Sequence, residues 1–133
     1  MPFLNFKDVG SVKSDWTGQI VIDVTNAFML PAEVQEAELK GRLSSEVNAD
    51  RVPGAKLVKA FNQLPWQGAP CSRCGRRVVF ISSDHEDASA KVAHLAEKLG
   101  FAPIEVGKIG EGGRLIQAPN ALVFQDLIKF GAK

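Results

Sequence analysis

The segment KLVKAFNQLP, from Lys56 to Pro65, begins as an apolar strand and turns polar within a few residues. An earlier segment, QIVIDVTN from Gln19 to Asn26, does the same, because its β-branched run ends in aspartate, threonine and asparagine. Short, nearly continuous apolar runs of this kind are typical of parallel strands that are covered on both faces. The two segments therefore predict two buried strands, each followed directly by polar side chains.

The remaining segments continue an alternation of strands and helices. RRVVFIS predicts a third strand, and APIEV, from Ala102 to Val106, predicts a weaker fourth. The helix expected between them has its apolar positions at Ala88, Val92, Leu95 and Leu99, a capping box from Ser83 to Glu86, and a terminal glycine at Gly100. Two more helices are expected, one over Ser44–Arg51 that is capped by Ser44 or Ser45 and ended by Pro53-Gly54, and one over about Ala121–Phe130. This order predicts an α/β fold with a parallel sheet of about four strands and flanking helices.

The composition narrows the class of protein. A chain of 133 residues with 45% hydrophobic and 23% charged residues is typical of one globular domain. The net charge of +1 gives no electrostatic footprint for nucleic acid. No apolar run approaches the ~18 residues of a membrane span, and the first residues do not form a signal peptide. We therefore expect a cytoplasmic protein that binds neither nucleic acid nor membrane.

Polar residues at the ends of the first two strands form the candidate site. If these strands are parallel neighbours, Thr25 and Asn26 meet Lys59 and Asn62 at one edge of the sheet, where α/β proteins bind ligands. A structural alternative remains open, in which the asparagines make turn hydrogen bonds and Asp23 pairs with Lys59 as a buried ion pair.

Four longer segments carry a resemblance to a known family. These segments are GQIVIDVTNAF, SSEVNADRVPGAKLVKAFNQLP, GRRVVFIS and LGFAPIEVGKIGEGGRLIQAP. Their order and spacing resemble those of predicted dinucleotide-binding oxidoreductases, which are related to the NADPH-dependent reductase of the deazaflavin coenzyme F420. The resemblance implies a Rossmann-like domain that binds NADP or NAD and passes a hydride to a deazaflavin, a flavin or another small-molecule acceptor. It also implies a cofactor-binding site made of Thr25, Asn26, Lys59, Ala60, Phe61 and Asn62.

The sequence departs from that family at the phosphate-binding motif. It contains no G-x-G-x-x-G, whose glycines let the backbone approach a pyrophosphate. The glycine cluster at Gly107–Gly113 has different spacing and is expected to form a loop over the cleft. We therefore interpret residues 1–133 as the C-terminal half of a truncated Rossmann-like domain, with Met1 as an internal or alternative start. An exposed sheet edge then predicts a homo-oligomer, with MPFLNFKDV helping to cover the open surface.

The two cysteines do not predict a metal site. Cys71 and Cys74 have the C-x-x-C spacing of redox and zinc sites, but one pair supplies half of a zinc site and no second pair exists. Reduced loop cysteines are the ordinary state in a cytosolic protein, and a redox role for the pair stays open.

Two functions from different classes follow from the sequence. The chain is either the cofactor-facing and acceptor-facing half of an NAD(P)H-dependent oxidoreductase, incomplete alone, or a non-catalytic α/β module for self-association or partner binding. No catalytic acid or base can be assigned, and whether the chain is an enzyme on its own stays open because the dinucleotide fingerprint is absent.

Overall fold

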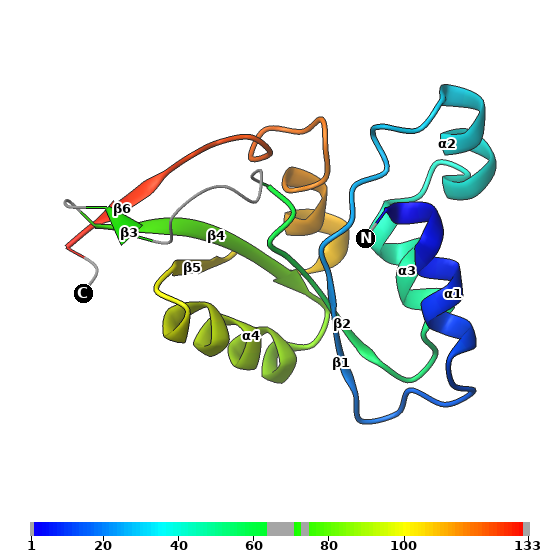
Figure 1. Cartoon of the computed structure of the whole chain (residues 1–133), viewed down its shortest axis with the longest axis horizontal. Coiled ribbons are helices and arrows are strands. Elements are labelled where there is room, and N and C mark those ends of the chain that lie inside the picture. The colour runs from blue at the N-terminus through cyan, green and yellow to red at the C-terminus, as the bar shows by residue number, and fades with distance from the viewer. Residues whose placement is uncertain (1, 64–70, 73–74, 132–133) are drawn as a thin grey trace.

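The protein is a mixed α/β fold in a computed structural model that describes residues 2–63, 71–72 and 75–131 (Figure 1). The helices are α1 (Phe6–Ser11), α2 (Ala32–Leu39), α3 (Ser44–Arg51) and α4 (Glu86–Lys98), with a 3-10 turn η1 (Phe3–Asn5) and a π-helical turn η2 (Ile109–Gly113). The strands are β1 (Ile20–Asp23), β2 (Lys56–Ala60), β3 (Cys71–Ser72), β4 (Gly75–Ser83), β5 (Ala102–Glu105) and β6 (Ile128–Phe130). The expected α/β class is confirmed.

The sheet contains two parallel pairs that meet at an antiparallel junction. β1 pairs with β2 in parallel, with Ile20 opposite Lys56 and Asp23 opposite Lys59. β4 and β5 are also parallel, which confirms the strand–helix–strand unit around α4. β2 and β4, however, run antiparallel, so the sheet is not parallel throughout. The segment between them has no described helix to carry a parallel crossover, and its β3 returns antiparallel along β4.

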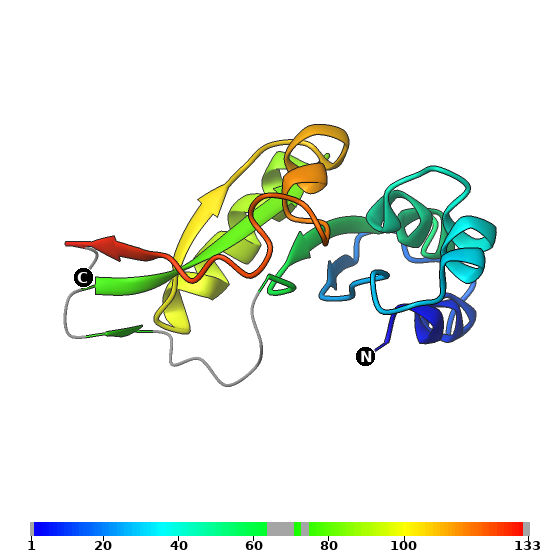
Figure 2. The ribbon, with the colours of Figure 1, turned by 90° about the horizontal axis from the view of Figure 1, so that it is seen from above.

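Helix α4 covers one face of the sheet (Figure 2). Its buried stripe is Ala88, Val92 and Ala96, which pack against alternate residues of β2 and β4. The prediction that the side chains of Leu95 and Leu99 contribute to the core is wrong, since both are exposed. The small alanines allow the helix to lie close to the sheet, so its longer leucines stand on the outer flank.

The two ends of α4 form in different ways. Gly100, with φ +91°, ends the helix as expected, because Phe101 N donates to Ala96 O and Gly100 N donates to Glu97 O. The predicted capping box is wrong: residue His85 precedes the helix without a side-chain cap. Ser83 instead donates to Leu57 O at 2.7 Å and accepts from His85 N at 3.1 Å, so it ties two strands to the turn before the helix.

Helices α1 and α3 cover the opposite face over β1 and β2. Phe6 is buried beside Leu43, Val52 and Leu57, so the N-terminal segment packs on its own chain. The bounds of α3 are as predicted, but neither Ser44 nor Ser45 is its cap. Leu43 precedes the helix, and the Glu46 carboxylate accepts its N–H at 3.0 Å.

The expected helix at Ala121–Phe130 is wrong. Turns occupy residues 121–124, and β6 pairs antiparallel with the beginning of β4. Val78 N donates to Leu127 O at 2.8 Å. For this segment, pairing with β4 is therefore more favourable than a helix, because its apolar pattern is short and has no cap. Within the described residues, no helix is long and apolar enough to cross a membrane.

A matched pair of substitutions tests this arrangement. We expect Ile81→Ala to lower the free energy of unfolding by about 2–5 kcal/mol, because Ile81 is fully buried between β2 and α4. Leu95→Ala should change it by less than about 0.5 kcal/mol, because that side chain is 41% exposed. Urea unfolding followed by circular dichroism measures both, and a larger loss at Leu95 would contradict the burial pattern.

Candidate functional site

The ends of β1 and β2 lie side by side and point the same way. Asp23 and Lys59 are direct neighbours across this parallel pair, so the residues that follow each strand emerge at one edge. This confirms the expectation that the two polar tips share one place in the fold.

A buried ion pair joins β1 and β2 beneath α3. Lys59 Nζ lies 3.3 Å from Asp23 Oδ2, and neither side chain is exposed. Ser45, from the first turn of α3, donates its hydroxyl to the same carboxylate oxygen at 3.1 Å. Asp23 Oδ1 accepts from Thr25 N at 2.9 Å and from Thr25 Oγ1 at 2.7 Å. Both carboxylate oxygens therefore have partners, as a buried charge requires.

The protonation of this pair follows from its partners. Burial raises the pKa of the Asp23 carboxyl, but the charge of Lys59 and the hydrogen bonds from Thr25 and Asn48 together lower it more. The pKa of Asp23 therefore lies below its ordinary value. Burial lowers the pKa of Lys59, and the facing carboxylate opposes that effect without cancelling it.

Lys59 also fixes the backbone that leaves β1. Its Nζ donates to Thr25 O at 2.8 Å, and Asn48 Nδ2 donates to Thr25 Oγ1 at 3.2 Å. Thr25, Lys59 and Ala60 are all buried. In this structure they support the site from within. Lys59 can affect a ligand only indirectly, through the groups to which it is hydrogen-bonded.

Asn26 and Asn62 form an amide clasp between the two strand ends. Asn26 Nδ2 donates to Asn62 O at 2.8 Å, and Asn62 Nδ2 donates to Asn26 Oδ1 at 3.1 Å. Asn62 Nδ2 also donates to Ile116 O at 2.6 Å, which ties the clasp to the segment after η2. The carbonyl oxygen of the Asn62 side chain is buried and has no hydrogen-bond partner. An unpaired buried acceptor of this kind raises the free energy of the folded state unless a donor reaches it.

Phe61 has a strained backbone between the strand and the clasp. Its φ of +59° lies in the left-handed region, which non-glycine residues adopt at an energetic cost. Its half-buried ring meets Phe101 edge to face, with ring centroids 5.9 Å apart. The turn directs Asn62 toward Asn26 and sends Gln63 into the sheet.

Gln63 is a positioning residue that the sequence pattern did not indicate. Its Nε2 donates to Val78 O at 3.0 Å, and its Oε1 accepts from Phe80 N at 2.9 Å. The buried side-chain amide thus forms the hydrogen bonds with the backbone of β4 that a neighbouring strand would otherwise form. A glutamine directly after a buried strand and a turn is the only signal that the sequence offered.

The glycine-rich segment lies against α3 and the end of β4. Gly107–Gly113 was expected to be a loop, and its last five residues form the π-helical turn η2. A Cβ on Gly112 would lie 2.0 Å from Val106 O, so only glycine fits that close approach. Beyond the turn, Gln117 Oε1 accepts from Ser44 N at 2.6 Å and from Ser44 Oγ at 2.9 Å. These contacts anchor the segment on the first turn of α3.

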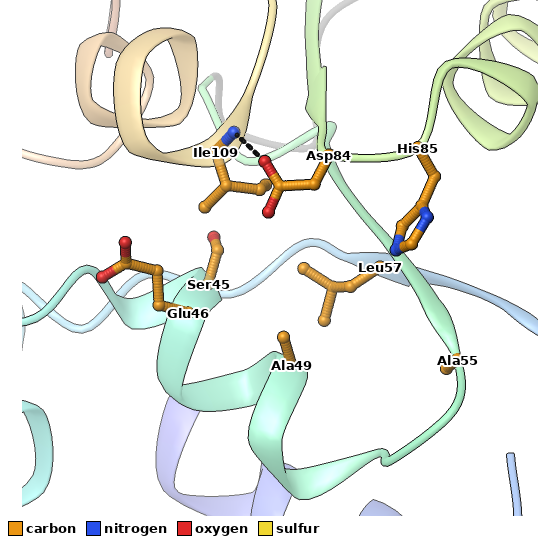
Figure 3. A pocket seen from close by; sticks show the side chains of 8 residues that line it. All are labelled: Ser45, Glu46, Ala49, Ala55, Leu57, Asp84, His85 and Ile109. Carbon is orange, nitrogen blue, oxygen red and sulfur yellow. Dashed lines mark hydrogen bonds between the residues drawn. The ribbon is translucent and has the colours of Figure 1, made fainter.

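A small open pocket lies beside this site, and Ser45 contributes to both (Figure 3). It opens between α3, β2 and the turn before α4, where Asp84 Oδ1 accepts from Ile109 N at 3.1 Å. Its lining is Ser45, Glu46, Ala49, Ala55, Leu57, Asp84, His85 and Ile109. None of the residues predicted for the cofactor site lines it, and no group of three or more metal-ligating side chains occurs in the described part of the chain.

Leu64, Pro65 and Trp66, which follow Gln63 in the sequence, lie outside the described residues, and so does Cys74 of the C-x-x-C pair. Cys71 begins the short strand β3.

Sequence comparison identifies reductases among the relatives of this chain. No family model matches. The rat metalloreductase STEAP3 is 27% identical over 120 residues, which are 90% of this chain and 24% of that protein. Human metalloreductase STEAP2 is 27% identical over 106 residues, or 79% of this chain and 20% of that protein. The chain thus spans a quarter or less of these curated relatives.

Solved structures extend the comparison to the fold. The hypothetical protein SMa0349 from Sinorhizobium meliloti matches with a TM-score of 0.85 and 40% identity, over 96% of this chain and 63% of that one. A putative F420-dependent NADP-reductase from Arthrobacter sp. FB24 matches with a TM-score of 0.55 and 22% identity, over 79% of this chain and 60% of that one. The chain is similar in sequence to these metalloreductases, and its fold resembles that of the putative NADP-reductase. The resemblance stated from its sequence is thereby confirmed, and the second structure supports the Rossmann-like fold.

Breaking the buried ion pair should destabilise the protein strongly. We expect Lys59→Met to lower the free energy of unfolding by about 3–5 kcal/mol, because it leaves the Asp23 carboxylate buried without its cation. The double variant Asp23→Asn/Lys59→Met should recover a large part of that loss. Urea unfolding of both single variants and the double variant measures the coupling, and strictly additive losses would contradict it.

The same pair predicts the response to acid. Because the pKa of Asp23 is lower in the folded than in the unfolded chain, its stabilisation is present above the ordinary carboxyl pKa of about 4 and is lost as the pH falls further. Asp23→Asn should flatten this acid limb of the stability curve. Asp8→Asn, on the exposed side of α1, controls for the loss of one carboxyl, and an equal flattening there would contradict the prediction.

Proposed function

We propose that this chain provides the cofactor-facing and acceptor-facing side of an NAD(P)H-dependent oxidoreductase. The observation that carries the proposal is the amide clasp at the ends of two neighbouring parallel strands, with the strained Phe61 beside it. Ligands of α/β proteins bind at such an edge, and backbone strain concentrates at functional sites. The relationship to metalloreductases and the Rossmann-like fold supply the reaction class.

In this proposal the predicted site residues have two different roles. Asn26, Phe61 and Asn62 contact the nicotinamide: the amides bond its carboxamide, and the ring of Phe61 shields one face from water. The unpaired Oδ1 of Asn62 is the acceptor that a carboxamide N–H would satisfy once the clasp opens. Thr25, Lys59 and Ala60 hold those residues in place. Hydride transfer needs orientation and exclusion of water more than an acid or base from the protein.

This sequence contains no motif that would bind the phosphates of the cofactor. It has no G-x-G-x-x-G, and the backbone of the glycine cluster is committed to η2 and its contact with Val106. We therefore propose that the chain alone binds NADP or NAD weakly and that a phosphate-binding segment completes the site. The acceptor is proposed as a deazaflavin, a flavin or another small molecule, and the compartment as the cytoplasm.

The second candidate is a non-catalytic module for self-association or partner binding. The absent fingerprint favours it, and so does the way in which Asn26 and Asn62 bond each other. A purely structural clasp would remain closed whatever ligand is added. The two functions therefore differ in one measurable property, which is the response of these two side chains to a nicotinamide.

A titration with NADPH separates the two candidates. In the proposed function, the side-chain amide signals of Asn26 and Asn62 shift saturably in nitrogen–proton spectra, and Asn26→Ala weakens binding by about fivefold, since one net hydrogen bond contributes about 1 kcal/mol. Asn5→Ala, in the exposed turn before α1, is the matched control. If NADPH leaves both amide signals unchanged at millimolar concentration, the chain binds no nicotinamide at this clasp and the oxidoreductase proposal fails for the chain alone.

A further inference from the structure

Strands β1 and β5 lie at edges of the sheet, and their outer sides differ in chemistry. In the part of the chain that the structure describes, β1 pairs with β2 alone and β5 with β4 alone (Figure 1). Unpaired strand edges attract other strands, and natural proteins protect them with proline, charge or a covering element. Which backbone groups point outward on each strand decides whether such protection exists.

The alternation of a parallel pair identifies the outward groups of β1. Lys56 N donates to Gln19 O at 2.9 Å, so Gln19, Val21 and Asp23 direct their backbone N–H and C=O toward β2. The N–H and C=O of Ile20, Ile22 and Val24 therefore point away from the sheet. These three residues are half-buried, whereas β2, one strand further in, is almost wholly buried.

Strand β5 is protected against pairing. Val106 N donates to Ile81 O at 2.8 Å, so Ala102 and Ile104 face β4, and Pro103 and Glu105 face outward. Pro103 has no N–H to offer an incoming strand. Glu105, whose carboxylate accepts a hydrogen bond from Ser89, adds a charge to the same edge.

Strand β1 has no comparable protection. Its sequence, IVID, contains no proline, and its single charge is the Asp23 carboxylate that Lys59 already neutralises inside the molecule. The side chains of Ile20 and Ile22 extend the α4 side of the core toward this open edge. The edge therefore combines free backbone donors and acceptors with apolar side chains and no net charge.

We propose that β1 pairs antiparallel with β1 of a second copy of this chain, about a two-fold axis at Ile22. In this register Ile22 meets its own copy, and Ile20 meets Val24 on each side, which gives about six backbone hydrogen bonds by the antiparallel pattern. The residues whose backbone groups bond across the axis are all aliphatic, and Val21 lies opposite Asp23, so no like charges oppose each other and β-branched pairs form. A two-fold interface requires a self-complementary surface, and this strand provides one. The inference does not depend on nicotinamide binding.

The test is sedimentation of the full chain together with edge variants. We expect a mass near twice 14.4 kDa at about 100 μM protein. Ile22→Pro removes an outward N–H without removing a β1–β2 hydrogen bond, and it should raise the dimer dissociation constant by at least about tenfold. Ile20→Lys, which places a charge at the same edge, should do likewise. Ile104→Lys on the protected strand β5 is the matched control and should leave the dimer intact.

Hydrogen exchange of the backbone amides in the unaltered chain tests the proposal even if a variant does not fold. The amides of Ile20, Ile22 and Val24 should exchange at least about tenfold more slowly in concentrated than in dilute protein, because only the dimer bonds them. A monomer at about 100 μM, or a dimer in which these three amides exchange equally fast at both concentrations, overturns the proposal. Neither outcome bears on NADPH binding, so the two proposals fail separately.

Discussion

The buried contact between Lys59 and Asp23 is the constraint on which the rest of this edge depends. Moving two charges out of water is unfavourable, and their attraction offsets that only when every remaining donor and acceptor has a partner. Here the carboxylate bonds Thr25 and Ser45 as well as Lys59, and Lys59 also bonds the carbonyl of Thr25. One ion pair therefore fixes two strands, the first turn of α3 and the backbone that carries Asn26.

The amide clasp is built on this foundation. Because β1 and β2 are held in register by Asp23 and Lys59, Asn26 and Asn62 emerge close enough to bond each other. The left-handed Phe61 then lets the chain turn, so that Gln63 replaces a missing strand against β4. A local strain and a buried polar side chain thus compensate each other, and both lie within three residues of the strand end.

The sequence predicted the parts of this fold that depend on local pattern. The paired strands, the helix Ser44–Arg51 and the α4 unit follow from apolar runs, turns and a terminal glycine, and all are observed. It failed where distant groups decide the outcome. A cap for α3 came from Glu46 and Gln117 rather than from its serines, and β6 formed because β4 offered an edge. The partners of Asp23 and Lys59 were anticipated in part, but the inward direction of Lys59 depends on tertiary packing.

The choice of polar groups beneath α3 has a bearing on function. A buried ion pair is weak evidence for stability, because well-packed apolar residues of the same volume often serve as well or better. An apolar pair at these positions would still hold β1 to β2, but it could not bond the carbonyl of Thr25 or order the backbone before Asn26. The polar solution is therefore better explained by the position of the clasp than by the stability of the sheet. A module that only associated through the outer edge of β1 would have no need of it, which favours an origin of this edge in ligand binding.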